Sequence, residues 1–446
     1  MTLDARRGSR FEYAGFDLEP DRNQVVCRYR LDDREFREVI SFPGGGDWSQ
    51  PAVEQAARLL FLLTGVSYYK AGAPPVIDLG TTALTGTELR FLREYYLEGL
   101  GEFGYRNDLD LSGLRIDAPT LVREGPPAGY RPVDGRPLVP FGGGVDSIVS
   151  VELIRKQAPD VALFVVNRPG DTFDAIEEPA LVAGLPVVRA ERSIDEQILR
   201  SAELGFLNGH VPVTGIISAI AVLAAVLEGR DAVVMSNEWS ASCATLEVNG
   251  RFINHQYSKS ESFEAGFRQV IAECLGERPD YFSLLRPMTE IWIAERFAEL
   301  PQYFDHFRSC NRAFRIDRAR RAAHWCGECD KCAFIDLVLA PYLDEPVLRK
   351  VFRGAEPLAN PELLEMFRTL LALTPDAKPW ECVGDVTESR VAARMAAARP
   401  DRHDNPLLAA LVAEAESFPD PTVAELTRPL GRHFVPERYA PDLLLV

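Results

Sequence analysis

The stretch LVPFGGGVDS, residues 138–147, decides the fold. Its apolar start, residues 138–141, predicts a short strand that leads directly into three glycines, and an amphipathic helix is expected over residues 147–156. Glycines let a backbone approach an anion closely, and a helix N-terminus carries partial positive charge. The stretch therefore predicts a strand, a phosphate-binding loop and a helix, with a plain glycine turn as the alternative.

The residues after the glycines suggest how this loop binds its ligand. Ser147 can donate its hydroxyl to a phosphate, whereas Asp146 can hold Mg²⁺ or fix the loop. The spacing matches neither the GxxxxGK[ST] loop nor the GxGxxG turn. The nucleotide-binding residues that we expect are Gly142, Gly143, Gly144, Asp146, Ser147, Asn167 and Thr214.

The sequence around the loop alternates between apolar strands and helices. This alternation predicts a doubly wound parallel α/β sheet within residues 136–345. Residues 1–135 are expected to form an N-terminal α+β domain, joined through a Pro- and Gly-rich linker at 123–137, and residues 346–446 a C-terminal helical segment. The expected strands are 11–16, 24–31, 36–42, 138–141, 161–166, 186–189 and 231–235. The expected helices are 52–64, 86–98, 147–156, 216–227, 361–373, 387–398 and 405–416.

The composition excludes several classes of protein. The chain has 446 residues, 46% hydrophobic and 26% charged, which is ordinary for globular proteins. Its net charge of −17 argues against a nucleic-acid or anionic-membrane binder. The longest apolar stretch, residues 211–227, is shorter than the roughly 20 residues of a membrane span and predicts a buried helix. No apolar signal segment is recognised, so we expect a cytoplasmic protein, and no oligomeric state is predicted.

A cysteine cluster late in the chain predicts a metal site. Cys310 is followed after fifteen residues by CGECDKC, which contains Cys326, Cys329 and Cys332. Four thiolates complete a tetrahedral zinc site, which is structural because it leaves no position for water. An iron–sulfur cluster with His324 as a further ligand, or free buried cysteines, are the alternatives. The arginines between these cysteines predict either a solvated helix face or a phosphate-binding patch: Arg308, Arg312, Arg315, Arg318, Arg320 and Arg321.

Two polar segments are candidates for the chemistry. Residues 235–244, MSNEWSASCA, follow a strand at the sheet edge where open α/β folds bind ligands. Residues 254–264, NHQYSKSESFE, are dense in hydrogen-bonding side chains, with a polar surface loop as the alternative. The proton carriers that we expect to be catalytic are His255 first, then Cys243, Glu238, Tyr257 and Lys259.

A further segment, SYYKAGAP at residues 67–74, places two aromatic rings and a cation beside a flexible turn. Such a set can stack on a base or pair with a carboxylate or phosphate. An ordinary helix end with a lysine in its last turn is the alternative. The residues that we expect to contact the substrate are Tyr69, Lys70, Asn254 and Ser258.

The glycine loop resembles the SGGxDS signature of the PP-loop ATP pyrophosphatase superfamily. Residues 142–147 match five of its six positions, and Gly142 replaces the usual serine, which removes one donor to pyrophosphate. The resemblance implies a HUP-like sheet and cleavage of ATP between its α and β phosphates. It also implies adenylation of a substrate oxygen, with Mg²⁺ neutralising the pyrophosphate. The cysteine cluster resembles the zinc site of 7-cyano-7-deazaguanine synthases.

Longer motifs resemble one narrower family, the ATP-dependent UDP-N-acetyl-α-D-muramoyl-L-alanyl-L-glutamate epimerases. They are SYYKAGAP, FGGGVDS, HVPVTGIIS, SNEWSAS followed by NHQYSKS, and CGECDKC, and the resemblance covers about residues 10–345. The resemblance implies inversion of the terminal L-Glu of UDP-MurNAc-L-Ala-L-Glu through an acyl-adenylate, with release of AMP and pyrophosphate. The alternatives are a PP-loop enzyme of nucleobase or tRNA modification and a non-catalytic nucleotide sensor.

Overall fold

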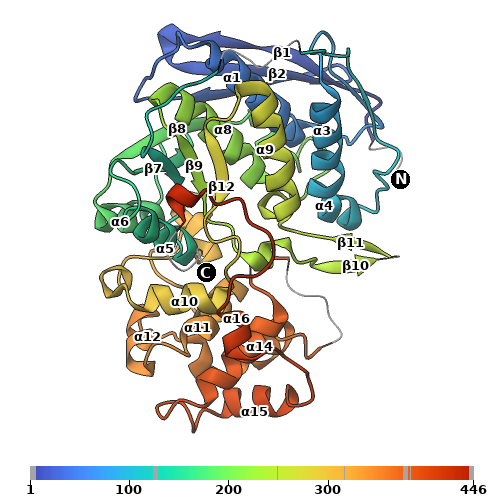
Figure 1. Ribbon diagram of the computed structural model, residues 1–446. Coiled ribbons are helices and arrows are strands. Elements are labelled where there is room, and N and C mark those ends of the chain that lie inside the picture. The colour runs from blue at the N-terminus through green and yellow to red at the C-terminus, as the bar shows by residue number, and fades with distance from the viewer. Residues whose placement is uncertain are drawn as a thin grey trace.

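The computed structural model describes residues 7–123, 129–248, 250–315, 317–374, 380–381 and 383–440. Within these residues, one ten-stranded sheet runs through the molecule, and helices cover it (Figure 1). Its strands are β1 Phe11–Glu19, β2 Gln24–Leu31, β3 Arg34–Ser41, β4 Val76–Asp78, β5 Arg115–Asp117, β6 Pro137–Pro140, β7 Ala162–Asn167, β8 Val187–Ser193, β9 Ala232–Met235 and β12 Asp280–Ser283. A separate hairpin pairs β10 Leu246–Val248 with β11 Arg251–Ile253.

The helices group by position in the chain. Those up to residue 275 are α1 Pro51–Thr64, α2 Val66–Tyr69, α3 Gly86–Gly99, α4 Gly101–Arg106, α5 Val145–Ile154, α6 Asp174–Ala183, α7 Glu196–Leu199, α8 Val213–Glu228 and α9 Glu261–Leu275. The remaining helices gather at the lower end of Figure 1. They are α10 Glu290–Ala298, α11 Asp330–Leu339, α12 Glu345–Val351, α13 Leu364–Leu370, α14 Val386–Ala397, α15 Pro406–Glu414 and α16 Val423–Leu426.

The strand order is β12-β9-β6-β7-β8-β3-β2-β1-β4-β5. The five strands from β12 to β8 are parallel, as the alternating pattern predicted. From β6 the chain proceeds through β7 to β8 on one side and then returns to β9 on the other. The order therefore reverses between β6 and β9, which is the point where doubly wound sheets bind ligands.

Strands from both sides of the expected domain boundary at residue 135 belong to one sheet, which was not predicted from the sequence. Strand β8 pairs antiparallel with β3, so the first segment's strands extend the parallel sheet and make it mixed. A buried ion pair lies beside this junction, with 2.7 Å between Arg192 Nε and Glu38 Oε1. Arg192 also donates to Ser67 Oγ at 2.9 Å. The expected domain boundary at residue 135 stays a prediction. Strands from both expected domains belong to one sheet, so the sheet does not mark a boundary there.

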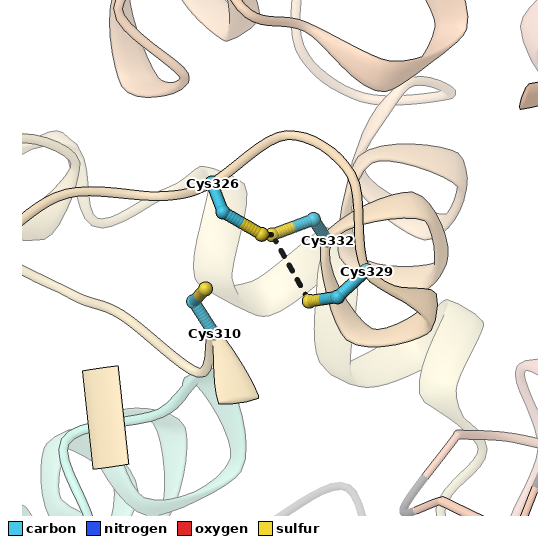
Figure 2. Close-up of side chains that lie close together, drawn as sticks. All are labelled: Cys310, Cys326, Cys329 and Cys332. Carbon is cyan, nitrogen blue, oxygen red and sulfur yellow. Dashed lines mark hydrogen bonds between the residues drawn. The ribbon is translucent and has the colours of Figure 1, made fainter. Parts of the chain in front are cut away.

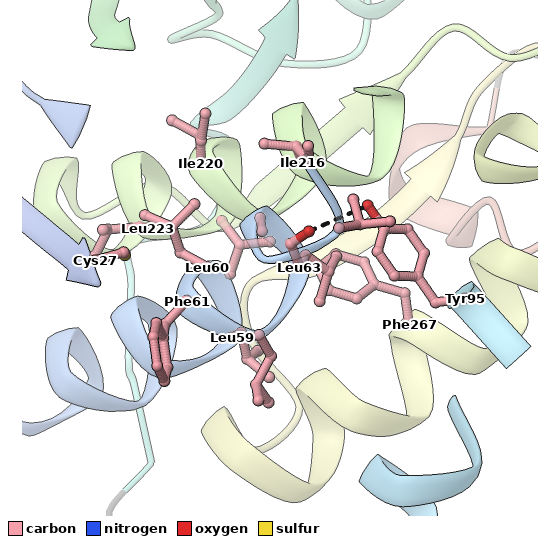
Figure 3. Close-up of a cluster of buried hydrophobic side chains, with 14 of the residues drawn as sticks. Cys27, Leu59, Leu60, Phe61, Leu63, Tyr95, Ile216, Ile220, Leu223 and Phe267 are labelled. Carbon is pink, nitrogen blue, oxygen red and sulfur yellow. Dashed lines mark hydrogen bonds between the residues drawn. The ribbon is translucent and has the colours of Figure 1, made fainter. Parts of the chain in front are cut away.

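Hydrophobic side chains cover both faces of the parallel strands. Leu138 and Phe164 belong to one buried cluster, whereas their chain neighbours Val139 and Leu163 belong to another. Successive strand residues point to opposite faces, so these are the two sides of the sheet. The first cluster packs against α1, α3, α8 and α9, as Figure 3 shows in part.

Helix α8 confirms the buried helix predicted from the longest apolar stretch. Its residues from Ile216 to Leu227 are almost all without exposed surface. They pack against α1 (Figure 3). Among the described residues, no helix has both the length and the apolar character of a membrane span.

Most of the predicted elements are present, with shifted ends. Helix α5 begins at Val145, directly after the N-cap Gly144 and two residues before the predicted start. Helix α13 begins only at Leu364, because Pro361 starts a 3₁₀ turn first. Strands β4, β5 and β12 were not predicted, since three- and four-residue strands carry little periodicity.

Candidate functional site

A cavity of about 370 Å³ opens at the point where the strand order reverses. The loop after β6 and the polar residues after β9 both line it, as the carboxyl ends of parallel strands should. The start of α8 adds Thr214, and the segment around the cysteine cluster adds a further wall. We call that further wall the cysteine-side wall, and it comprises Arg308, Ser309, Phe314 and Lys331.

The glycine loop, residues 142–147, is tightly fitted. Gly143 has a φ of +74°, and a Cβ there would lie 2.1 Å from the Ala175 carbonyl oxygen, so no other residue fits. A Cβ on Gly144 would lie 2.7 Å from Ser309 Oγ, because the cysteine-side wall packs on the loop. Ser147 donates its hydroxyl to the Gly144 carbonyl at 3.0 Å. The ten-residue α5 thus presents its N-terminus to the cavity.

Three cationic side chains line this cavity within the described chain: Lys259, Arg308 and Lys331. Arg308 is only 5% exposed, and its Nε has no hydrogen-bond partner among the described residues. Its Nη2 lies 2.9 Å from Glu178 Oε1. The hydroxyl of Ser236, also in the lining, is buried without a partner in the described structure. Unsatisfied buried donors of this kind are suited to the oxygens of an anionic ligand.

Two carboxylates, Asp146 and Glu238, lie in the same lining. Burial and the charge of Glu238 raise the pKa of Asp146 to about 6, while Lys331 and Lys259 oppose the rise. Burial and the charges of Asp146 and Glu238 also raise the pKa of Glu290, the first residue of α10. Oxygen ligands suit Mg²⁺, and a bound cation would relieve this repulsion. Asp146 therefore fits Mg²⁺ as an oxygen ligand, with Glu238 beside it in the lining.

The structure brings many of the predicted site residues together at this cavity: Gly142, Gly144, Asp146, Ser147, Thr214, Glu238 and Lys259. Gly143 lies in the same loop behind the lining. Asn167 ends β7 beside the lining residue Val166, and its buried Oδ1 has no partner within the described chain. The glycine loop and the segment after β9 are therefore neighbours in space.

The other predicted residues lie outside the cavity lining. Tyr69 has no exposed surface and packs in an aromatic core, where its hydroxyl donates to the Pro74 carbonyl at 2.9 Å. Tyr257 donates to Glu94 Oε1 at 3.1 Å, and burial raises its pKa well above the ordinary value. Asn254 donates to the Ala241 carbonyl at 2.9 Å. Ser258 is buried, and Cys243 is half-buried at the end of a 3₁₀ turn.

His255 forms a separate group with two residues that were not predicted, Glu102 and His210. Its Nδ1 makes a short hydrogen bond to Glu102 Oε2, and its ring centre lies 4.3 Å from that of His210. Burial lowers the pKa of His210 to about 4, helped by the charge of His255. Lys70 lies nearby and donates to Asn208 Oδ1 at 2.9 Å. We call Glu102, His210 and His255 the histidine group.

The four cysteines of the cluster converge, as Figure 2 shows. The ligand atoms of Cys310, Cys326, Cys329 and Cys332 all lie within 4.8 Å of one another. Cys332 Sγ is 3.6 Å from Cys326 Sγ and 3.5 Å from Cys329 Sγ. This donor set fits a tetrahedral zinc ion. His324 lies apart from the set and hydrogen-bonds to Arg353.

Comparison with known proteins gives full-length relatives. The MurL N-terminal domain matches residues 2–284, and the MurL C-terminal domain matches residues 306–426. The chain belongs to the MurL epimerase family. It is 37% identical to the UDP-N-acetyl-alpha-D-muramoyl-L-alanyl-L-glutamate epimerase of Salinispora tropica, over 98% of this chain and 96% of that one. Enzymes with the same name from Xanthomonas oryzae and a Micromonospora species are 34% and 36% identical, over 97% and 98% of this chain and 96% and 98% of theirs.

The residues that line the cavity come from both of the matched domains. The glycine loop and Lys259 lie in the N-terminal match, whereas Arg308 and Lys331 lie in the C-terminal match. The cavity therefore forms only where the two matched parts meet. The alternative of a nucleobase or tRNA modification enzyme is not favoured by relatives that are named epimerases over their full length.

The arginine run does not form the solvated helix face that was one of its two interpretations, and the phosphate-binding patch stays a prediction. Residues 311–314 and 318–320 form short 3₁₀ turns instead of a helix. Arg318 and Arg321 pair with Asp171, and Arg312 pairs with Glu328, so those charges are compensated. Of the six arginines, Arg308 lines the cavity in the described structure.

Sequence reasoning did not single out Lys331 or His210 as site residues. Lys331 lies inside CGECDKC and His210 inside HVPVTGIIS, so both belong to motifs already recognised. The sequence did offer one signal for Lys331, its position directly before the expected metal ligand Cys332, because a bound metal fixes the residues beside its ligands. For Glu102 there was no signal, since its helix resembles any amphipathic helix.

Proposed function

We propose that this chain inverts the terminal L-Glu of UDP-MurNAc-L-Ala-L-Glu to D-Glu, using ATP and releasing AMP and pyrophosphate. The observation that carries the proposal is the cavity at the reversal of the strand order, which combines a glycine loop with three cationic side chains. The names of the full-length relatives supply the substrate. The use of ATP places the proposed reaction in the cytoplasm.

The cavity lining offers a set of contacts for the phosphates of ATP. The N-terminus of α5 and the side chains of Arg308 and Lys331 would contact the two phosphates that leave. Asp146 would hold Mg²⁺, which would neutralise charge on the leaving pyrophosphate. Gly142, which replaces a serine, has open space around it and leaves its backbone N–H for a phosphate oxygen.

Adenylation explains why an epimerase would consume ATP. The proton on the α-carbon of a carboxylate is barely acidic, because its removal places a second negative charge beside the first. Attack of the carboxylate oxygen on the α-phosphorus forms an acyl-adenylate and expels pyrophosphate, which removes that charge. A base then takes the α-proton, and protonation from the other face gives the D centre. Water finally cleaves the acyl–phosphate bond to give AMP and the free carboxylate.

Lys259 and Glu238 are the proton carriers that the cavity favours. Of the five residues expected to be catalytic, these two line the cavity, whereas His255, Tyr257 and Cys243 lie outside the lining. Lys259 ends a 3₁₀ turn, Tyr257–Lys259, and Glu238 follows β9, so they reach the cavity from different segments. Two groups from different segments could serve the two faces of the α-carbon.

The cysteine cluster has a structural role in this proposal. Cys310 follows Arg308 and Ser309 in the sequence, and Cys332 follows Lys331. A zinc ion bound by the four thiolates would therefore hold both cations against the glycine loop.

Two half-reactions test the proposal separately. Exchange of labelled pyrophosphate into ATP reports adenylation, and chiral analysis of the glutamate reports inversion. Lys259→Met should keep the exchange and lose the inversion, whereas the surface variant Lys156→Met should keep both. Loss of both activities in Lys259→Met would make Lys259 a nucleotide contact. Absence of substrate-dependent pyrophosphate release from the wild-type protein would refute the proposal.

A further inference from the structure

The histidine group gathers three metal-ligating side chains from three distant segments. Glu102 lies on α4, His210 precedes α8, and His255 follows β11. Their ligand atoms all lie within 4.8 Å of one another. None of the three lines the cavity at the glycine loop. They form a second cluster, with a donor set different from that of the cysteines.

We propose that Glu102, His210 and His255 bind one divalent transition-metal ion of the zinc type. Two imidazoles bonded to one ion at about 2.1 Å hold their ring centres roughly 4.5–5.5 Å apart. The ring centres of His210 and His255 are 4.3 Å apart, slightly below this range, so metal binding would separate the two rings by a few tenths of an ångström. The ion would replace the hydrogen bond between His255 Nδ1 and Glu102 Oε2.

The surroundings hold each ligand in position. Arg106 Nε lies 2.6 Å from Glu102 Oε1, which leaves Oε2 directed at His255. The backbone N–H of His255 donates to Thr245 Oγ1 at 3.1 Å. Lys70 donates to the Gly209 carbonyl at 3.2 Å, beside His210. Supports of this kind orient the ligands around a bound metal.

The ligand atoms of the histidine group and the charges around it determine which type of ion it fits. One carboxylate is a ligand, while the cations Arg106, Lys70 and Lys259 lie close enough to interact with Glu102 or His210. Glu381 lies near His255 and adds one negative charge. Mg²⁺ and Ca²⁺ need several oxygen ligands, which this set lacks. Imidazole nitrogens suit zinc, cobalt and related ions, so we expect retention of these and not of Mg²⁺.

Three protein ligands leave the coordination sphere open, unlike the closed set of four cysteines. The histidine group lies next to the cavity, since Lys259 lines the cavity and its charge also acts on His210. An open position can take water or a carboxylate or phosphate oxygen. The inference concerns metal binding alone and stands whether or not the proposed epimerisation is correct.

Cobalt loading tests the site without any activity measurement. Chelated protein is loaded with Co²⁺ and passed through gel filtration, and its metal content and visible spectrum are then recorded. Thiolate-bound cobalt gives sulfur charge-transfer bands, whereas cobalt bound by histidine and carboxylate does not. We expect two ions per wild-type chain, one of each type, and no retained ion when Mg²⁺ is used instead.

Variants then assign the second ion. His210→Ala, His255→Ala and Glu102→Gln should each retain one ion with the thiolate spectrum. The surface variant His403→Ala should retain two. The intact thiolate spectrum shows that each variant is folded. Only one thiolate-bound ion in the wild-type protein, or two ions in the His210→Ala/His255→Ala double variant, would overturn the proposal.

Discussion

The two walls of the cavity differ in chemistry and in origin. The glycine-loop wall follows β6 and β9 and supplies backbone N–H groups and the carboxylates of Asp146 and Glu238. The cysteine-side wall comes from segments beside the cysteine cluster, including the start of α11, and supplies Arg308 and Lys331. In the proposed reaction, neither wall alone would balance the charges of ATP and Mg²⁺. The difference between the walls therefore suggests separate roles in that proposal: the sheet would position the nucleotide, and the cysteine cluster would bring the cations to it.

The largest effect is expected from a substitution in the glycine-loop wall. Asp146→Asn should lower turnover about a hundredfold, because Mg²⁺ loses a charged ligand that contributes in the transition state. Steady-state release of pyrophosphate measures this. The surface variant Asp305→Asn, whose partner is Lys350, should be unaffected. Turnover that is unchanged in Asp146→Asn would remove this carboxylate from the chemistry.

The cysteine-side wall should control affinity for the nucleotide. Lys331→Met and Arg308→Met should each raise the Kd for ATP about tenfold, because each removes a charge-assisted hydrogen bond to a phosphate. Titration calorimetry measures the change, and Lys350→Met, a surface lysine, is the control. If both variants bind ATP as tightly as the wild type, the phosphates do not contact this wall.

Loss of the cluster metal should weaken ATP binding several-fold. Cys326→Ser removes one thiolate, so the segments that carry Arg308 and Lys331 lose their common anchor. We expect lower zinc content, a lower Tm and a higher Kd for ATP in the same variant. Cys27→Ser, which replaces a buried cysteine of β2, is a control for general destabilisation. Zinc loss with unchanged ATP affinity would separate the cluster from the cavity.

The smallest expected effect is a change of stability with pH. The pKa of Asp146 is raised to about 6 from 3.8, so the folded state binds a proton that the unfolded state has already released. The ligand-free protein should therefore lose stability as pH rises from about 4 to about 6. Thermal unfolding without Mg²⁺ measures this, and Asp146→Asn should flatten the profile. A wild-type profile no steeper than that of the variant would contradict the assignment.

The parts of the site that were predictable have local signals in the sequence. Three successive glycines between a strand and a helix, and three cysteines within CGECDKC, each mark a candidate site within a few residues. Parallel strands and most helices were predictable for the same reason, because periodicity is a local property.

The remainder depends on contacts between distant segments. The pairing of β8 with β3 joins two expected domains into one sheet, and no pattern within either strand encodes the partner. The histidine group joins Glu102, His210 and His255 across the fold. His255 was selected as the base from the polarity of its segment, but polarity does not show whether a side chain faces the cavity. Tyr69 was selected because it lies beside Lys70, and the helix directs it into the aromatic core.

The most direct test of the central claim is one reaction in heavy water with UDP-MurNAc-L-Ala-L-Glu, ATP and Mg²⁺. The account predicts D-Glu with deuterium at its α-carbon, formed only when ATP is present, together with AMP and pyrophosphate. Formation of ADP and orthophosphate, or D-Glu without ATP, would contradict it.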